Sequence, residues 1–222
     1  TDYDTRSRRT VAAVNASLWE PAHGCFRDCT AYADGAAPTS SQHPLAIGLY
    51  HNLFDEPQRE AVLESLTRPG LVQAEFYFQH YVLQALARHG RPAEALAAIR
   101  TLWRRNVEAE CNTVWEFHTA HEDVPEAMPY HSRCHAFSCA PLYFLQSVVL
   151  GVRPTQPGFA EFTLAPQPGD LAEAQGAVPT PHGLIRVAWR RAAPGTLSVS
   201  IDIPAGTRAV TTPTGEVRGP GR

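Results

Sequence analysis

The chain has 222 residues, of which 44% are hydrophobic and 18% are charged, a composition typical of a globular protein with one large domain or two ordinary ones. With 19 basic and 22 acidic residues its formal net charge is -3, which gives no electrostatic reason to expect binding to nucleic acid or to an anionic membrane surface. No apolar run reaches the roughly 18 residues of a membrane span, and the N-terminus lacks the basic-then-apolar pattern of a signal peptide.

The five cysteines indicate free thiols rather than a disulfide framework, because their number is odd and their spacing is irregular. The reducing cytoplasm is therefore the expected location. A zinc site could be assembled on paper from pairs of these cysteines with His131 and His135, but the pairs lack the CxxC spacing typical of zinc ligands. We expect no metal and no other cofactor. The cysteines are Cys25, Cys29, Cys111, Cys134 and Cys139.

The first hundred or so residues read as a succession of helices joined by short turns that contain Gly and Pro. The segment 75–89 is apolar on most sides, so it is expected to lie inside the fold. No motif recurs at a fixed period of about 20–50 residues, which argues against a repeat solenoid. The pattern predicts stacked antiparallel helical hairpins. The segments with apolar residues at helical spacing are 5–19, 41–53, 57–66, 75–89 and 95–103.

Two polar residues of this region leave alternatives open. Asp28 lies in the segment 24–41, which is expected to be a loop or a short hairpin. Its carboxylate could line a cleft, although exposure to solvent is the more common role of a loop aspartate. His43 follows Ser41, the expected cap of the second helix, and could point either into the mouth of a barrel or into solvent.

The segments 111–118, CNTVWEFH, and 130–137, YHSRCHAF, carry the strongest functional signal. They place a carboxylate, Glu116, beside the indole of Trp115, with imidazoles on either side. Glycoside hydrolysis uses carboxyl groups as acid and base, an aromatic ring forms an apolar wall for a sugar, and an imidazole can bind sugar hydroxyls. The alternative is a core tryptophan followed by a solvated glutamate, which is the commoner meaning of this dipeptide.

After residue 151 the apolar pattern changes from helical spacing to alternation between apolar and polar residues. Turns rich in Pro and Gly separate the alternating segments. This pattern predicts a small antiparallel β domain or sandwich that braces the helical part. A sixth helix, 137–150, is expected to precede it. The segments expected as strands are 159–164, 185–190, 197–203 and 208–212.

These segments resemble the C-terminal part of the bacterial α-L-rhamnosidases, which are inverting glycosidases built on a six-hairpin (α/α)6 barrel. Residues 113–116, TVWE, are similar to that family's Thr-x-Trp-Glu segment, and residues 132–141, SRCHAFSCAP, to its Ser-x-Cys-His-Ala-Trp-Ser-Ala-x-Pro helix start. Residues 150–154, LGVRP, with 157–159, resemble the beginning of its C-terminal β domain, and residues 180–189, TPHGLIRVAW, resemble the signature of that domain.

The resemblance implies a role for three residues. Glu116 matches the family's general base, His135 matches the histidine that contacts the bound sugar, and Trp115 would form a wall of the pocket. It also implies hydrolysis of terminal α-L-rhamnosyl groups with inversion, on a rhamnose-containing glycoside or polysaccharide. Phe137 departs from the pattern, since the family more often has Trp there, and this puts a wall or stacking contact in doubt.

The family's general acid lies in an acidic segment upstream of the second half of the barrel, and the chain contains no such segment. We therefore expect the chain to be the C-terminal portion of a larger enzyme, inactive alone, with any signal peptide upstream of Thr1. If the acid is nevertheless within the chain, the candidates are Glu122, Asp123 and Asp28. The competing interpretation is a non-catalytic carbohydrate-binding or scaffolding remnant, and the coding sequence upstream of Thr1 would separate the two.

The expected fold class is α + β and multidomain. Residues 1–150 are predicted to form the C-terminal half of an (α/α)6 barrel, and residues 151–222 a small antiparallel β-sandwich domain. The predicted helices are about half of those in such a barrel, so the apolar faces that meet the other half would be exposed. Large exposed apolar patches drive association, and we expect the chain alone to self-associate.

Overall fold

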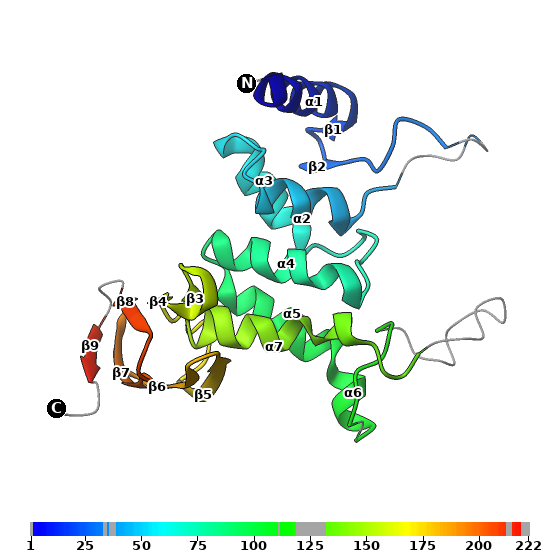
Figure 1. Ribbon diagram of the computed structural model, residues 1–222. Coiled ribbons are helices and arrows are strands. Elements are labelled where there is room, and N and C mark those ends of the chain that lie inside the picture. Colours follow the sequence, from blue (N-terminus) through cyan, green and yellow to red (C-terminus); the bar gives the residue numbers. More distant parts are fainter. Residues whose placement is uncertain are drawn as a thin grey trace. The chain divides into compact units, whose positions relative to one another are not determined.

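The computed structural model describes residues 2–32, 35, 39–110, 112–118, 132–211 and 215–218, which divide into two compact units, Thr1–His89 and Gly90–Arg222. Helices dominate the first unit, and the second contains both helices and sheets, so the fold is mixed (Figure 1). The elements of the first unit are α1 (Asp2–Leu18), β1 (Trp19–Glu20), β2 (Cys25–Phe26), α2 (Gln42–Tyr50), α3 (Glu56–Leu66) and α4 (Phe76–Arg88).

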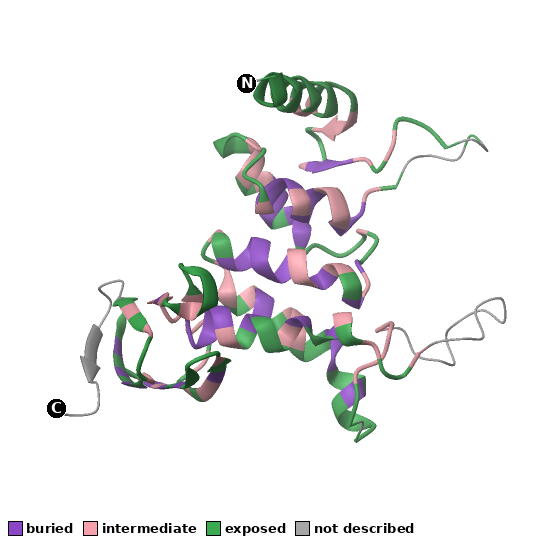
Figure 2. Cartoon of the chain, in the orientation of Figure 1, coloured by how far each residue is buried: buried purple, intermediate pink, exposed green. Residues whose placement is uncertain are grey.

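The core of the first unit is formed by the buried faces of α2, α3 and α4, which appear as purple bands in Figure 2. Eight of the 13 residues of α4 are buried, in agreement with the prediction that this helix lies inside. No residue of α1 is buried. Among the described helices, none combines the length and apolarity that crossing a bilayer requires. The largest fully buried side chains of this unit are Phe26, Phe76, Leu45, Leu49, Leu66, Leu83, Leu86, Gln79 and Val62.

The second helix ends earlier than its apolar spacing predicts. α2 stops at Tyr50, so Leu53, which the spacing assigns to its apolar face, lies in the following turn and is 37% exposed. The Leu53 N–H donates to the carbonyl of Gly48 at 2.9 Å. The ring of Phe54 then lies where a side chain at Gly48 would be, since an added Cβ would meet its Cζ at 1.9 Å. The chain therefore leaves the helical path after Tyr50, and the Phe54 ring packs against Gly48.

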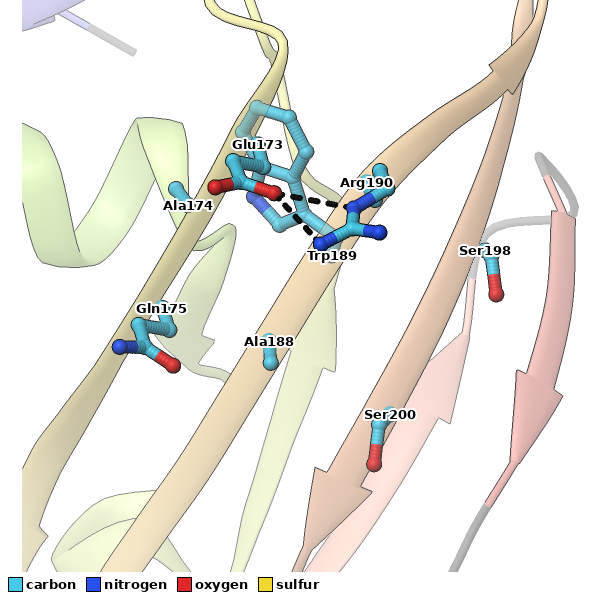
Figure 3. Close-up of a pocket in the computed structure, with 8 residues that line it drawn as sticks. All are labelled: Glu173, Ala174, Gln175, Ala188, Trp189, Arg190, Ser198 and Ser200. Atoms are coloured by element: carbon cyan, nitrogen blue, oxygen red, sulfur yellow. Dashed lines mark hydrogen bonds and ion pairs between the residues drawn. The ribbon is translucent and has the colours of Figure 1, made fainter.

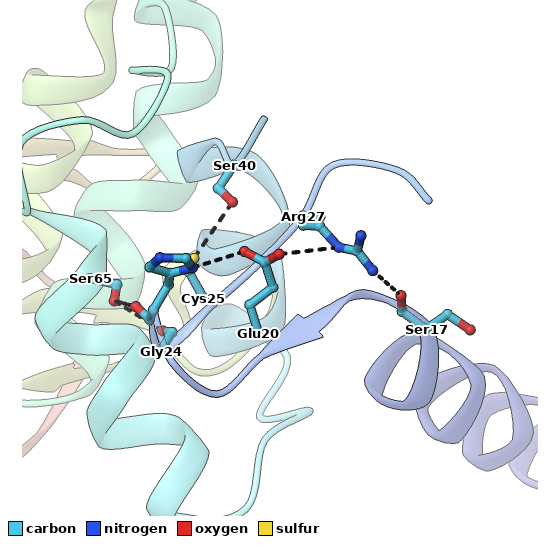
Figure 4. Close-up of polar contacts among 8 residues, drawn as sticks. Ser17, Glu20, Gly24, Cys25, Arg27, Ser40 and Ser65 are labelled. Atoms are coloured by element: carbon cyan, nitrogen blue, oxygen red, sulfur yellow. Dashed lines mark hydrogen bonds and ion pairs between the residues drawn. The ribbon is translucent and has the colours of Figure 1, made fainter. Parts of the chain in front are cut away.

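The β1–β2 hairpin links α1 to α3 through polar contacts (Figure 4). Arg27, just after β2, donates from Nη2 to the carbonyl of Ser17 in α1 at 3.0 Å and pairs with Glu20 at 3.5 Å. On the other side, the hydroxyl of Ser65 in α3 donates to the carbonyl of Gly24 at 3.0 Å. The exposed first helix is thus held by the hairpin that follows it.

The helices of the second unit are short and varied. They are α5 (Pro92–Leu102), α6 (Arg104–Glu108), η2 (Ala136–Cys139), α7 (Ala140–Phe144) and η3 (Leu145–Val149). The last three replace the single helix predicted for 137–150, because a 3-10 turn leads into a short α-helix and then into a π-helical turn. In that last turn the Leu150 N–H donates to the carbonyl of Leu145, five residues back, at 2.8 Å.

Two sheets follow, with strand orders β3-β4-β8 and β5-β6-β7-β9. Both are mixed, so the prediction of a purely antiparallel domain is wrong. β8 runs parallel to β4, and β9 runs parallel to β7. Both parallel strands come after a crossover, since the chain leaves β7 in one sheet, enters β8 in the other, and returns to the first sheet as β9. The strands are β3 (Val152–Pro154), β4 (Glu161–Leu164), β5 (Glu173–Thr180), β6 (Gly183–Ala193), β7 (Thr196–Asp202), β8 (Arg208–Thr211) and β9 (Gly215–Arg218), and the 3-10 turn η4 (Pro157–Phe159) precedes β4.

Alternating burial on β6 and β7 agrees with the predicted strand pattern. Trp189 on β6 stands opposite Val199 on β7, and both are buried. The indole N–H of Trp189 donates to the carbonyl of Val149 at 2.8 Å, which ties this sheet to η3. A second indole, that of Trp103 at the end of α5, donates to the carbonyl of Ser138 at 2.9 Å. The two tryptophans therefore anchor both ends of the helical run 136–149 within the unit.

Candidate active site

Backbone hydrogen bonds bring the two predicted site segments side by side. The Glu116 N–H donates to the carbonyl of Ser132, and the His135 N–H donates to the carbonyl of Val114, each at 2.9 Å. The hydroxyl of Thr113 adds a third link to the carbonyl of Arg133 at 2.6 Å. This pairing resembles that of adjacent strands and fixes which side chains of the two segments meet.

Glu116 and His135 are the side chains that meet. Oε2 of Glu116 lies 3.7 Å from Nδ1 of His135, and the two side chains are 24% and 35% exposed. The same carboxylate oxygen accepts the Ser132 N–H at 3.1 Å, a charge-assisted bond that holds the carboxylate in place. Sequence reasoning had no signal for this donor, since a backbone N–H does not depend on residue type. The pair can accept a proton at the carboxylate and bind a hydroxyl at the imidazole.

Aromatic rings flank this pair. The Phe137 ring lies 4.2 Å from the His135 ring, centroid to centroid, at a tilt of 39°. Phe137 stands where the resemblance leads one to expect Trp, and here it packs against the imidazole. The ring of Trp115 is half-buried, with the guanidinium of Arg133 at 5.9 Å from its centroid. This distance is at the outer limit of a cation–π contact.

The other candidate residues have structural roles or fall outside the described part. Asp28 accepts hydrogen bonds from the Ser41 hydroxyl at 2.7 Å and the Ser41 N–H at 3.1 Å, and from the Thr39 hydroxyl at 2.9 Å. It therefore anchors the start of α2, where Ser41 occupies the N-cap position without capping through its side chain. His43 lies 3.2 Å from the Ser41 hydroxyl and packs on Phe78 at 4.5 Å. The residues outside the described part are Cys111, Glu122, Asp123 and His131.

Metal-binding groups do not gather in the part of the chain that the structure describes. No three or more His, Cys, Asp or Glu side chains come together there as a metal site requires. Cys25 is a buried free thiol, Cys29 is half-buried, and Cys134 and Cys139 are exposed free thiols.

A hollow of about 530 Å³ on the outer face of β5, β6 and β7 is a second place to look for a ligand (Figure 3). Glu173 and Arg190 form an ion pair there at 2.9 Å, so their charges neutralise each other. Trp189 is only 3% exposed and therefore offers no open ring to a sugar. We assign this hollow no function. Its lining residues are Glu173, Ala174, Gln175, Ala188, Trp189, Arg190, Ser198 and Ser200.

Comparison with known proteins gives matches along most of the chain. The family model described as the bacterial alpha-L-rhamnosidase C-terminal domain matches residues 151–219. A GH78 family rhamnosidase of Bacillus sp. GL1 is 29% identical with a TM-score of 0.79, over 94% of this chain and 23% of its own. An α-L-rhamnosidase from Aspergillus terreus is 19% identical with a TM-score of 0.72, over 95% of this chain and 24% of its own.

A further match is a rhamnosidase from Klebsiella oxytoca with rhamnose bound, which is 27% identical with a TM-score of 0.55, over 66% of this chain and 28% of its own. A search of curated protein sequences finds no match. These results confirm the predicted resemblance to bacterial α-L-rhamnosidases. The chain spans about a quarter of the length of the solved structures that it matches.

Proposed function

We propose, on the premise that the chain is similar to α-L-rhamnosidases over most of its length, that it is part of a glycoside hydrolase that releases terminal α-L-rhamnosyl groups with inversion. The observation that carries the proposal is the approach of Glu116 to His135 at 3.7 Å, held by the backbone pairing of their two segments. The rhamnose bound to the Klebsiella enzyme supports rhamnose as the sugar.

In the proposed reaction Glu116 acts as the general base. Its ionised carboxylate takes a proton from a water molecule as the water oxygen bonds to the anomeric carbon, and the bond from that carbon to the leaving oxygen breaks on the opposite face. A general acid protonates the leaving oxygen, and this acid comes from another segment of the intact enzyme. Inverting enzymes keep the two carboxyl groups about 6.5–9.5 Å apart so that the water fits. His135 binds sugar hydroxyls, and Trp115 forms a wall of the pocket.

We further propose that residues 1–150 correspond to the C-terminal half of an (α/α)6 barrel and residues 151–222 to a β-sandwich domain. The order of the helices from α2 to α5 supports the first assignment. The family-model match over residues 151–219 supports the second. The rhamnose-containing glycoside or polysaccharide would then bind where loops such as 112–118 leave the helical part.

Replacing Glu116 by Gln in the intact protein tests the catalytic role. The amide oxygen of Gln can still accept the Ser132 N–H, so the fold and sugar binding should persist, while hydrolysis of an aryl α-L-rhamnoside should fall by about 10²–10⁴-fold. Glu108→Gln is the matched control, since this exposed glutamate on α6 forms a long ion pair of 3.8 Å with Arg104 and lies outside the proposed site. A Glu116→Gln enzyme that retains near wild-type turnover would refute the assignment.

Replacing His135 by Ala tests the binding role separately. The backbone N–H of residue 135 still bonds to Val114, so the pairing of the segments should survive the change. Inhibition by free L-rhamnose should weaken, because the imidazole that binds its hydroxyls is lost. An unchanged inhibition constant would count against this role while leaving that of Glu116 intact.

A further inference from the structure

Several buried polar atoms of the second unit have no hydrogen-bond partner within the described part of the chain. Buried polar groups of native proteins are nearly all paired, so each exception calls for an explanation. Asn106 on α6 is the clearest case, because it is only 6% exposed and neither Oδ1 nor Nδ2 has a hydrogen-bond partner among the residues that the structure describes. Side chains of this unit with such atoms include Asn106, Trp115, His135 and Ser138.

Asn106 belongs to the wall of a hollow of about 510 Å³, a size typical of small-molecule sites. His135 lines the same hollow, and its Nδ1 lies 3.7 Å from the Glu116 carboxylate, so the hollow adjoins the proposed base. Its wall is largely apolar with a few polar groups, the usual make-up of a ligand pocket. The lining residues are Trp103, Asn106, Val107, Asn112, Thr113, Val114, Cys134, His135, Ala136 and Cys139.

The chemistry of the wall selects a neutral, hydroxyl-bearing ligand. No Asp, Glu, Lys or Arg is among the ten lining residues, so nothing there is matched to a fixed charge on a ligand. A carboxamide donates through Nδ2 and accepts through Oδ1, which suits two adjacent hydroxyls, since each hydroxyl can do either. Apolar side chains such as Val107 and Val114 would face the C–H groups of the ligand.

We infer that Asn106 is a hydroxyl-binding residue of a neutral-sugar subsite next to Glu116, an inference that rests on the proposed function and extends it. Both amide atoms of Asn106 are covered by protein. The sugar is reached when the carboxamide turns about χ2, a soft torsion for Asn, with the backbone in place. The turn is favourable on binding because it exchanges two unpaired polar atoms for hydrogen bonds.

The alternative is that Asn106 is only a structural imperfection, and a second buried amide provides the control. Gln84 on α4 is 7% exposed and its Nε2 also has no partner, but the residue does not line the hollow. Asn106→Leu removes two unpaired buried atoms, and Gln84→Leu removes one. Both variants of the intact protein should therefore melt at or above the wild-type temperature.

Calorimetry distinguishes a sugar-binding role of Asn106 from a structural imperfection. The ligands to be measured are four neutral sugars, L-rhamnose, L-fucose, D-glucose and D-galactose. Asn106→Leu should weaken the tightest of them by about tenfold or more, and Gln84→Leu should leave it unchanged. If Asn106→Leu fails to fold, Asn106→Ala, which removes the carboxamide without adding bulk, takes its place and should also bind the sugar more weakly.

Sugar binding that does not depend on Asn106, or no binding of any of the four sugars, would overturn the inference. The proposed function is judged by a different measurement, the dependence of aryl rhamnoside hydrolysis on Glu116. If hydrolysis requires Glu116 but the Asn106 variant binds the sugar as tightly as the wild type, the subsite is refuted and the proposed function stands. If the Glu116 variant hydrolyses the aryl rhamnoside at the wild-type rate, the proposed function is refuted.

Discussion

Replacing Gly151 by Ala should destabilise the protein more than the same change at a glycine of equal backbone conformation. Gly151 follows η3 at the start of the matched β domain and has φ +77°, while Gly195, in the turn between β6 and β7, has φ +76°. An added Cβ at Gly151 would lie 2.2 Å from the carbonyl carbon of Ala165 and 2.3 Å from the nitrogen of Pro166. At Gly195 nothing lies within 4 Å.

The comparison separates strain from collision. An L-residue at positive φ costs about 1–2 kcal/mol, and restriction of the unfolded chain by Ala returns about 0.4–1 kcal/mol, so Gly195→Ala should lose about 1 kcal/mol of unfolding free energy. Gly151→Ala bears the same strain and also forces two backbone segments apart. Overpacking typically costs about 1–3 kcal/mol, which brings its expected loss to about 2–4 kcal/mol.

Equilibrium urea unfolding of both variants, followed by tryptophan fluorescence, measures the two losses at one temperature. The buried Trp189 and Trp103 both lie in this unit and report on it. The m-values should match that of the wild type, since neither change alters the surface exposed on unfolding. Equal losses for the two variants would mean that residues 151 and 165 do not approach as closely as described, and the reasoning would fail.

Two further predictions concern pH and association. Burial, reinforced by Arg88, lowers the pKa of His80 below its ordinary value of 6.5, so the folded state binds this proton less readily than the unfolded state. The stability of the fold should therefore fall as the pH drops below about 6.5. His80→Gln should make the accompanying fall in the melting temperature smaller. A variant with the same acid-induced loss as the wild type would rule this out. The 222-residue chain alone should self-associate and show no turnover, since Val107, Leu142 and Tyr143 are 75%, 58% and 50% exposed, and a monodisperse, active monomer in light scattering would contradict this.

The sequence names the candidate site residues because they lie in two short, distinctive segments. TVWE and SRCHAF name Glu116, Trp115 and His135 directly, and the structure brings the first and last together. The contribution of the Ser132 backbone and the unpaired state of Asn106 could not be predicted, because both depend on which segments become neighbours.

The strands were predictable where apolar residues alternate clearly with polar ones. They were not predictable where small residues stand at the apolar positions. β6 and β7 alternate clearly, whereas β5 was missed because its buried side carries little apolar bulk. Gly176 on β5 leaves room for Leu150, whose Cδ1 would lie 2.7 Å from a Cβ at that position. Leu150 therefore supplies the apolar bulk that the sequence of β5 lacks. The sequence pattern of a single strand cannot show a contribution from another segment.

The parallel pairings of β8 and β9 impose an order on the folding of the β domain. β8 joins β4 across a sequence separation of 47 residues, as between Arg208 and Glu161, and β9 joins β7 in the other sheet. Closing the loop between β4 and β8 is slow compared with forming the adjacent β5–β6–β7 meander, whereas β7 and β9 pair over the shorter separation between Leu197 and Gly215. During synthesis β4 and β7 therefore each keep an open hydrogen-bonding edge until β8 and β9 leave the ribosome, and an open edge can pair with the wrong strand.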